Sequence, residues 1–154
     1  MKYRIILLCL ALIILPVMSL GSGSDIETHR DCKHCGMDRK QFGYSRMLIS
    51  YADGTASGTC SLNCIVTDMA ANKGKKIASI QVADRDSHTL IDVNKAFWVV
   101  GGSKRGVMSA RAKWAFETKA AAEKFIAQHG GKYATWEEAL QAAKDDAAPK
   151  PHKH

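Results

Sequence analysis

The sequence predicts an α+β fold in which small antiparallel sheets pack against helices. Short segments that alternate apolar and polar residues come in groups joined by tight turns, as in antiparallel sheets. Segments with apolar residues at helical spacing follow each group rather than each strand. A chain of 154 residues is long enough for one domain, or for two small halves that share a core. We therefore expect small antiparallel sheets with helices, arranged as two related sub-lobes of the ββα type.

The strands are expected in two groups. Residues 45–51 alternate and lead through an Asp-Gly turn into residues 55–59, which makes a hairpin with Cys60 at its exit. Beyond it, Gly101-Gly102 opens a loop that runs to Met108. Alternating or apolar-rich runs predict the remaining strands at 77–82, 90–93, 96–100 and 113–117.

Three helices are expected, each with a recognisable start. The first covers about residues 62–72, with Ser61 as its cap. The second begins at Thr118 and is stopped by a pair of glycines. Thr135-Trp136-Glu137-Glu138 has the pattern of a capping box, which predicts a third helix through Lys144.

The start of the chain has the layout of an export signal. Lys2 and Arg4 supply the positive start, residues 5–18 are apolar, and small residues follow. This apolar run of about 14 residues is shorter than the roughly 20 that a spanning helix needs. Cys9 lies inside the run without the small residue before it that lipid attachment requires. We expect an exported, periplasmic protein whose only membrane contact is this segment, where it stays uncleaved.

The charge and the motif content of the sequence argue against nucleic-acid binding and against catalysis. Without the two basic residues of the signal, the formal net charge of +7 falls to +5, and the remaining Lys and Arg are scattered among acidic residues. They do not interleave with aromatic residues as in RNA-binding proteins, so no nucleic-acid partner is expected. Hydrolase, metalloprotease and phosphate-loop patterns are absent from the sequence, which favours a binder over an enzyme. We divide the chain into a signal peptide (1–23), a metal-binding domain (24–144) and a flexible polar tail (145–154).

Two cysteine pairs are the strongest functional signal. Cys32 and Cys35 lie in a Cys-x-x-Cys-Gly-Met motif, and the second pair follows at the expected hairpin exit and helix start. Thiolates and thioethers are soft ligands that select Cu(I), and a helix start favours thiolates over thiols. Met108 lies in a glycine-containing loop, where core filling does not explain a methionine. The metal ligands that we expect are Cys32, Cys35, Met37, Cys60, Cys64 and Met108.

Other interpretations of the thiols stay open at this point. Four cysteines can close a tetrahedral zinc site, or pair as disulfides in an oxidising compartment, and either arrangement would stabilise an interaction module. Cys32 and Cys35 also have the spacing of a thiol-disulfide oxidoreductase, although the motif precedes every expected strand. His34 could reach a metal, but a surface histidine in a charged loop is the commoner case.

The chain resembles the NosL-type proteins, accessory factors of nitrous oxide reductase. The resemblance rests on the Cys-x-x-Cys-Gly-Met motif behind an export signal, on residues 96–101, on Val107-Met108, and on the run from Phe116 to Gly131. It covers about residues 31–142 and implies a periplasmic Cu(I) chaperone that delivers copper to the reductase.

The resemblance also implies ligand roles and shows two departures. It assigns thiolate and thioether ligation to Cys35 and Met37, with Met108 as a further candidate. This chain lacks a lipid-attachment cysteine, and it carries the additional pair Cys60 and Cys64. We therefore expect a copper-receiving enzyme as partner, with apo nitrous oxide reductase as one candidate, and we keep a homodimer as an alternative assembly.

Overall fold

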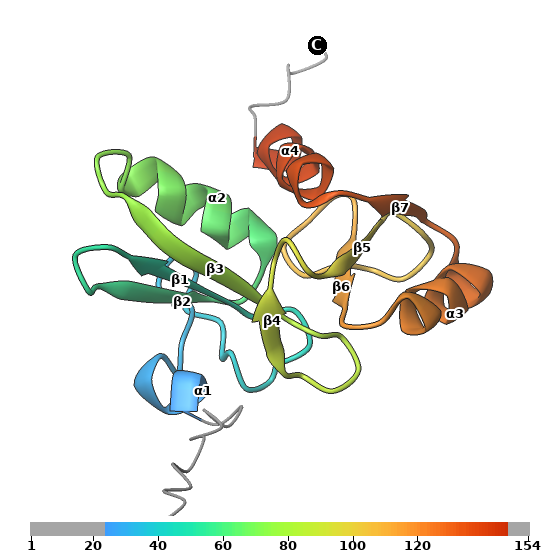
Figure 1. Ribbon diagram of the computed structural model, residues 1–154, viewed down its shortest axis with the longest axis horizontal. Coiled ribbons are helices and arrows are strands. Elements are labelled where there is room, and N and C mark those ends of the chain that lie inside the picture. The colour runs from blue at the N-terminus through green and yellow to red at the C-terminus, as the bar shows by residue number, and fades with distance from the viewer. Residues whose placement is uncertain (1–23, 148–154) are drawn as a thin grey trace, which may run out of the picture.

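The computed structural model describes residues 24–147. Two antiparallel sheets and their helices make up the fold (Figure 1), which confirms the predicted α+β class. The expected signal peptide and residues 148–154 of the expected tail lie outside the described residues. Within residues 24–147, no helix is long and apolar enough to cross a membrane.

The first unit begins with a short helix and then builds a four-stranded sheet. Its elements are α1 (Ser24–Thr28), β1 (Met47–Tyr51), β2 (Ala56–Thr59), α2 (Leu62–Ala71), β3 (Ile77–Ala83) and β4 (Leu90–Asp92). The strand order is β2-β1-β3-β4. The hairpin register pairs Met47 with Thr59, so the chain leaves the sheet beside β1 and turns directly into α2.

The second unit is a three-stranded sheet with a helix on each side (Figure 1). Its elements are β5 (Phe97–Val100), β6 (Lys113–Phe116), α3 (Lys119–His129), β7 (Lys132–Ala134) and α4 (Trp136–Ala147), and the strand order is β6-β5-β7. The strand β7 is not among the predicted elements.

Both units have the same order of connection. In each, the first strand is central, the second pairs on one side, and a strand that follows the helix pairs on the other. The two orders are β2-β1-β3 and β6-β5-β7, with α2 and α3 in equivalent places. The predicted pair of related sub-lobes is confirmed, and each is a ββαβ unit rather than a ββα unit.

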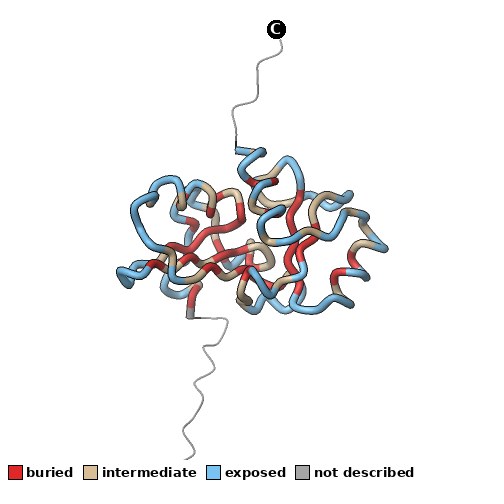
Figure 2. Tube along the Cα trace, turned by 45° about the horizontal axis from the view of Figure 1, so that its top comes forward, coloured by how far each residue is buried: buried red, intermediate tan, exposed pale blue. Residues whose placement is uncertain are grey.

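One hydrophobic cluster spans both units. Met47 and Ile49 of β1 point to the same face at the two-residue period and meet Ile65 of α2, while Trp98 and Ala143 join from the second unit. Buried residues therefore run through the strands of both units (Figure 2). A second cluster fills the other face of the second sheet under α3; it contains Val99, Ala112, Trp114, Phe116, Ala122 and Phe125.

The element boundaries follow the predicted signals with two exceptions. Thr118 caps α3, and Thr135 and Glu138 form the expected reciprocal capping box. Ser61 has the extended backbone of a cap, but its side chain makes no capping hydrogen bond. The helix α4 continues past Lys144 to Ala147, so residues 145–147 are helical and not part of a flexible tail. Ion pairs explain why the helix extends this far, since Asp145 pairs with Arg111 and Asp146 pairs with Lys113.

A buried ion network anchors α1 to the first sheet. The carboxylate of Asp25 accepts hydrogen bonds from Arg39 at 2.8 Å and from Arg46 at 3.0 Å, and both guanidinium side chains are buried. Arg39 also donates to the carbonyl oxygens of Met47 and Thr59. Burial alone would raise the pKa of Asp25, but the hydrogen bonds and charges of Arg46 and Arg39 outweigh it and lower that pKa. The segment before the first strand is thereby fixed on the sheet.

Replacing Asp25 by Asn is expected to destabilise the fold by about 3 kcal/mol, because it leaves two buried guanidinium groups without their counter-charge. Urea unfolding followed by tryptophan fluorescence measures the loss. The matched control is Glu27→Gln, which neutralises an exposed acid on the same helix. Equal stability of the Asp25 variant and this control would contradict the anchoring role.

The same network predicts a pH dependence. Because the folded-state pKa of Asp25 lies below its ordinary value of 3.8, the ionised carboxylate stabilises the fold above that value. This contribution is lost as the pH falls through the lowered pKa. The stability difference between wild type and Asp25→Asn should therefore shrink as the pH falls below 3.8. A difference that grows on acidification would have the wrong sign for this network.

Candidate metal centre

Four cysteines from separate segments converge in the first unit. The sulfur atoms of Cys32, Cys35, Cys60 and Cys64 all lie within 4.8 Å of one another. The first pair comes from the loop between α1 and β1, Cys60 follows β2 directly, and Cys64 lies in the first turn of α2. The hairpin exit and the helix start therefore bring the second pair to the loop that carries the first.

The spacing of the sulfur atoms suits metal ligation. Cys35 and Cys60 are 3.4 Å apart, and Cys64 lies 3.8 Å from each of them. A disulfide needs about 2.05 Å, and all four cysteines are free. Tetrahedral Zn–S bonds of about 2.3 Å place sulfur atoms about 3.8 Å apart. The thiols are therefore at ligand separation rather than at bonding distance, and the disulfide framework does not describe this structure.

The backbone of the first motif forms a tight turn. The amide of Gly36 donates to the carbonyl of Cys32 at 2.9 Å, and the amide of Cys32 donates to the carbonyl of Met37 at 2.8 Å. Gly36 has a φ of +72°, the left-handed region that a side chain disfavours. The glycine of the motif therefore lets the chain reverse between the thiols and Met37. This turn is not at a helix start, where a dithiol oxidoreductase would place its first thiol.

Met37 adds a thioether to the thiols. Its sulfur lies 3.9 Å from the sulfur of Cys60, and its side chain is half-buried against the cluster with Phe42 and Val107. Cys35 is exposed, whereas the other three cysteines are buried. The centre thus has a closed interior of three thiols and an open edge at Cys35.

The side chain of Met108 is exposed beside this group. Its side chain is 53% exposed and lines an open cavity of about 570 Å³ formed by its own loop, while Val107 beside it packs on the cysteines. The structure brings together the four cysteines and Met37. Met108 directly follows Val107 in the loop between β5 and β6, residues 101–112, which we call the covering loop. Ligation by Met108 stays a prediction.

The thiols titrate as a group. Hydrogen bonds from Cys60 and then Cys64 lower the pKa of Cys32 far below its ordinary value. The bond to Cys32 raises the pKa of Cys60, and it raises the pKa of Cys64 to about 12. Within the metal-free cluster these hydrogen bonds favour the thiolate form of Cys32 over that of the helix-start thiols that the sequence favoured, because Cys60 and Cys64 act as donors to it. A metal ion would displace the remaining protons.

The buried side chain of Asp68 in α2 contacts the Cys-x-x-Cys motif through His34. His34 Nε2 lies 2.7 Å from Asp68 Oδ2, and the hydroxyl of Tyr51 donates to Asp68 Oδ1 at 2.5 Å. The Asp68 side chain is fully buried and stands one helical turn after Cys64, on the same face of α2. His34 therefore contacts the helix through Asp68 and positions the loop. The sequence analysis missed this contact; the one signal for it was an acid, Asp68, four residues after Cys64 on a mostly apolar helix.

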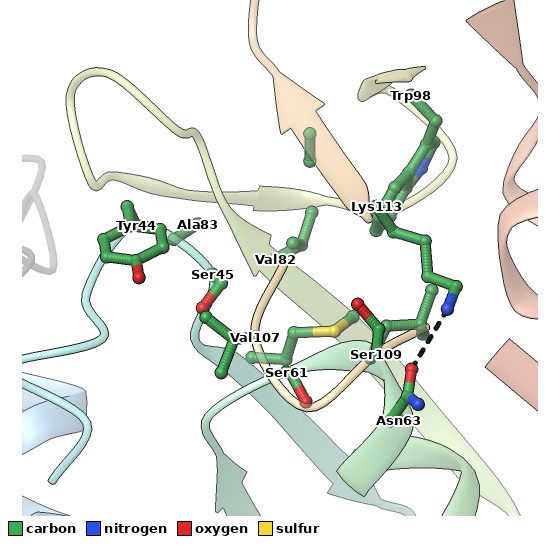
Figure 3. A pocket seen from close by; sticks show the side chains of 13 residues that line it. Tyr44, Ser45, Ser61, Asn63, Val82, Ala83, Trp98, Val107, Ser109 and Lys113 are labelled. Carbon is green, nitrogen blue, oxygen red and sulfur yellow. Dashed lines mark hydrogen bonds between the residues drawn. The ribbon is translucent and has the colours of Figure 1, made fainter. Parts of the chain in front are cut away.

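A side-chain hydrogen bond joins the second unit to the first turn of α2. Lys113 of β6 donates to Asn63 Oδ1 at 3.2 Å, next to Cys64, and forms an ion pair with Asp146 of α4. Figure 3 shows this bond at the edge of a cavity of about 20 Å³, with Val107 and Ser109 of the covering loop on its wall. Such a volume has room for about one water molecule. The covering loop and the thiol-bearing helix therefore meet at a tightly packed contact.

Fold and site together define a class: a small α+β protein with two ββαβ units whose clustered thiols and thioether suit a soft metal ion. The chain belongs to the NosL family, whose model matches residues 24–143. Among solved structures it is similar to the crystal structure of the copper chaperone NosL from Shewanella denitrificans. The identity is 23% and the TM-score 0.57, over 73% of this chain and 90% of that one. None of the curated protein sequences matches this chain.

Replacing His34 by Ala is expected to weaken metal binding about tenfold or more while all four thiols stay present, because the loop loses its contact with Asp68. Competition for Cu(I) or zinc with a chromophoric chelator under reducing conditions measures the change. Lys40→Ala, which removes an exposed charge from the same loop, is the control. Unchanged affinity in the His34 variant would contradict its positioning role.

Proposed function

We propose that this protein is an exported Cu(I)-binding metallochaperone that delivers copper to a periplasmic copper enzyme such as nitrous oxide reductase. The observation that carries the proposal is the convergence of four thiols and the Met37 thioether within one small centre. Soft ligands of this kind select Cu(I) over harder ions. Family membership and the likeness to a copper chaperone support the assignment. Export is proposed from the pattern of residues 1–23.

The open edge of the centre suits transfer. Cys32, Cys60 and Cys64 are buried and would retain the ion, whereas Cys35 is exposed and Met37 half-buried beside it. An incoming ligand from a partner would reach the ion at Cys35 first. Exchange of one ligand at a time can then move Cu(I) without its release into water. The proposed role requires binding and ligand exchange and no catalysed reaction.

The double variant Cys35→Ser/Met37→Ala is expected to lose Cu(I) to a competing chelator at least about tenfold more readily than wild type, because the two outer ligands are gone. Titration of the reduced protein against bathocuproine disulfonate measures this. Met69→Leu, a conservative change in the hydrophobic core, is the control. Failure of the wild type to compete, or full retention of Cu(I) by the double variant, would contradict the proposal.

A structural zinc site is the second candidate, because the sulfur separations fit a four-thiolate tetrahedron. In that case the protein would be an interaction module stabilised by its metal. Elemental analysis of protein from its native compartment separates the two: one tightly held zinc per chain with four protected thiols favours the module. Sedimentation of the metal-loaded protein tests the alternative of a homodimer.

A further inference from the structure

A third cavity lies beside the metal centre and is lined by basic and aromatic side chains. It is open, has a volume of about 610 Å³, and lies between the turn that joins β3 to β4 and the loop that joins β5 to β6. Its walls include Tyr44, Trp114, Arg85, His88, Lys104 and Arg105. A volume of this size is typical of a site for a small ligand or for a few side chains of a partner.

The lining carries a surplus of positive charge. Arg85, Lys104 and Arg105 face the cavity, and Asp86 is its one acidic lining residue. Asp86 pairs with Arg85, while neither Lys104 nor Arg105 forms an ion pair within residues 24–147. The cavity therefore attracts an anion.

The wall also contains hydrogen-bond donors without acceptors. Among the described residues, Trp114 Nε1 and Arg85 Nε are buried and have no hydrogen-bond partner. The guanidinium carbon of Arg85 lies 5.7 Å from the centre of the Trp114 ring and 5.0 Å from that of Phe125, so two aromatic rings lie close to the guanidinium. Buried donors are almost always paired in folded proteins. Their presence here, under a basic cavity, indicates a place for an acceptor from outside the chain.

We propose that this cavity binds a carboxylate group, supplied by an acidic side chain of a partner protein or by a free organic acid. The planar guanidinium of Arg85 matches the geometry of a carboxylate. Lys104 and Arg105 add charge at the rim, and the rings of Tyr44 and Trp114 can pack on an aliphatic stem. The assignment does not depend on the metal.

The cavity adjoins the metal centre. Lys104 and Arg105 belong to the same loop as Val107, which packs on the cysteines. On the other side, the ring of Tyr44 lies 6.4 Å from that of Phe42, which also packs on the cysteines. An acidic segment bound here would therefore lie next to the residues that cover the thiols.

Titration of reduced, metal-free, ¹⁵N-labelled protein tests the proposal. The probes are succinate, a short Glu-rich peptide, and the same peptide with Gln in place of Glu. The indole N–H signal of Trp114 should shift saturably with an anionic probe, with a Kd of about 1 mM or tighter, and binding should weaken at high salt. Lys104→Glu/Arg105→Glu should weaken binding at least about tenfold. Lys73→Glu/Lys76→Glu, an equal charge reversal on the exposed turn after α2, should leave it unchanged.

The titration results show whether the carboxylate comes from a partner protein or from a free organic acid. Saturation by the peptide alone assigns the site to a partner's acidic segment, and saturation by succinate alone assigns it to a free acid. Equal binding of the Gln peptide, unchanged binding in the Lys104/Arg105 variant, or no saturable shift with either anionic probe would overturn the proposal. A failed Cu(I) competition would leave this result standing, because the titration contains no metal.

Discussion

The burial of Arg39 is the constraint on which the metal centre depends. Its backbone amide donates to the carbonyl of Arg30, which closes the base of the cysteine loop, and its side chain donates to the carbonyl of Thr59, directly before Cys60. One residue thus holds the loop of the first thiol pair against the strand that delivers the second. The contact is so close that a Cβ at Gly58 would lie 2.6 Å from the Arg39 guanidinium carbon, so only glycine fits there.

The two ββαβ units make the same strand-to-helix junction and use it differently. In the second unit, the Thr118 hydroxyl caps α3 by accepting a hydrogen bond from the amide of Ala121. In the first, Ser61 stands at the equivalent cap without such a bond, and Cys60 and Cys64 flank it. In this unit the helix start therefore carries two cysteines, where a capping side chain serves the sister unit. A shared topology therefore carries a metal centre in only one of its two copies, where a loop arrives to supply the other ligands.

Local patterns account for what the sequence predicted. The hairpin at 45–59, the helix after Ser61 and the capping box at Thr135 depend on neighbouring residues, so spacing and turn chemistry were sufficient. The helix α1 is too short to be stable by itself and is held by the ion pairs of Asp25, which no local pattern encodes. The strand β7 consists of Lys132-Tyr133-Ala134 and exists through its pairing with β5.

In the candidate site, too, local sequence predicts some features and contacts between distant residues determine the others. Its ligand types were visible as cysteine pairs with a neighbouring methionine, but their convergence depends on Arg39 and on the pairing of Asp68 with His34, contacts between residues far apart in the sequence. Met108 shows the reverse case. A methionine in a glycine-containing loop suggested a ligand; in the structure its side chain is exposed and the neighbouring Val107 packs on the thiols, and ligation by Met108 stays a prediction.

The arrangement separates retention of a metal from its release. Three buried thiols lie on rigid elements, since Cys60 follows a strand, Cys64 belongs to a helix, and Cys32 is tied to Met37 by a backbone hydrogen bond. The outer edge is formed by the exposed Cys35, while Val107 of the loop between β5 and β6 packs on the buried thiols. That loop also carries Lys104 and Arg105 into the basic cavity. A partner that engages those charges would therefore contact the same loop that packs on the buried thiols, next to the open edge at Cys35 and without touching the buried ligands.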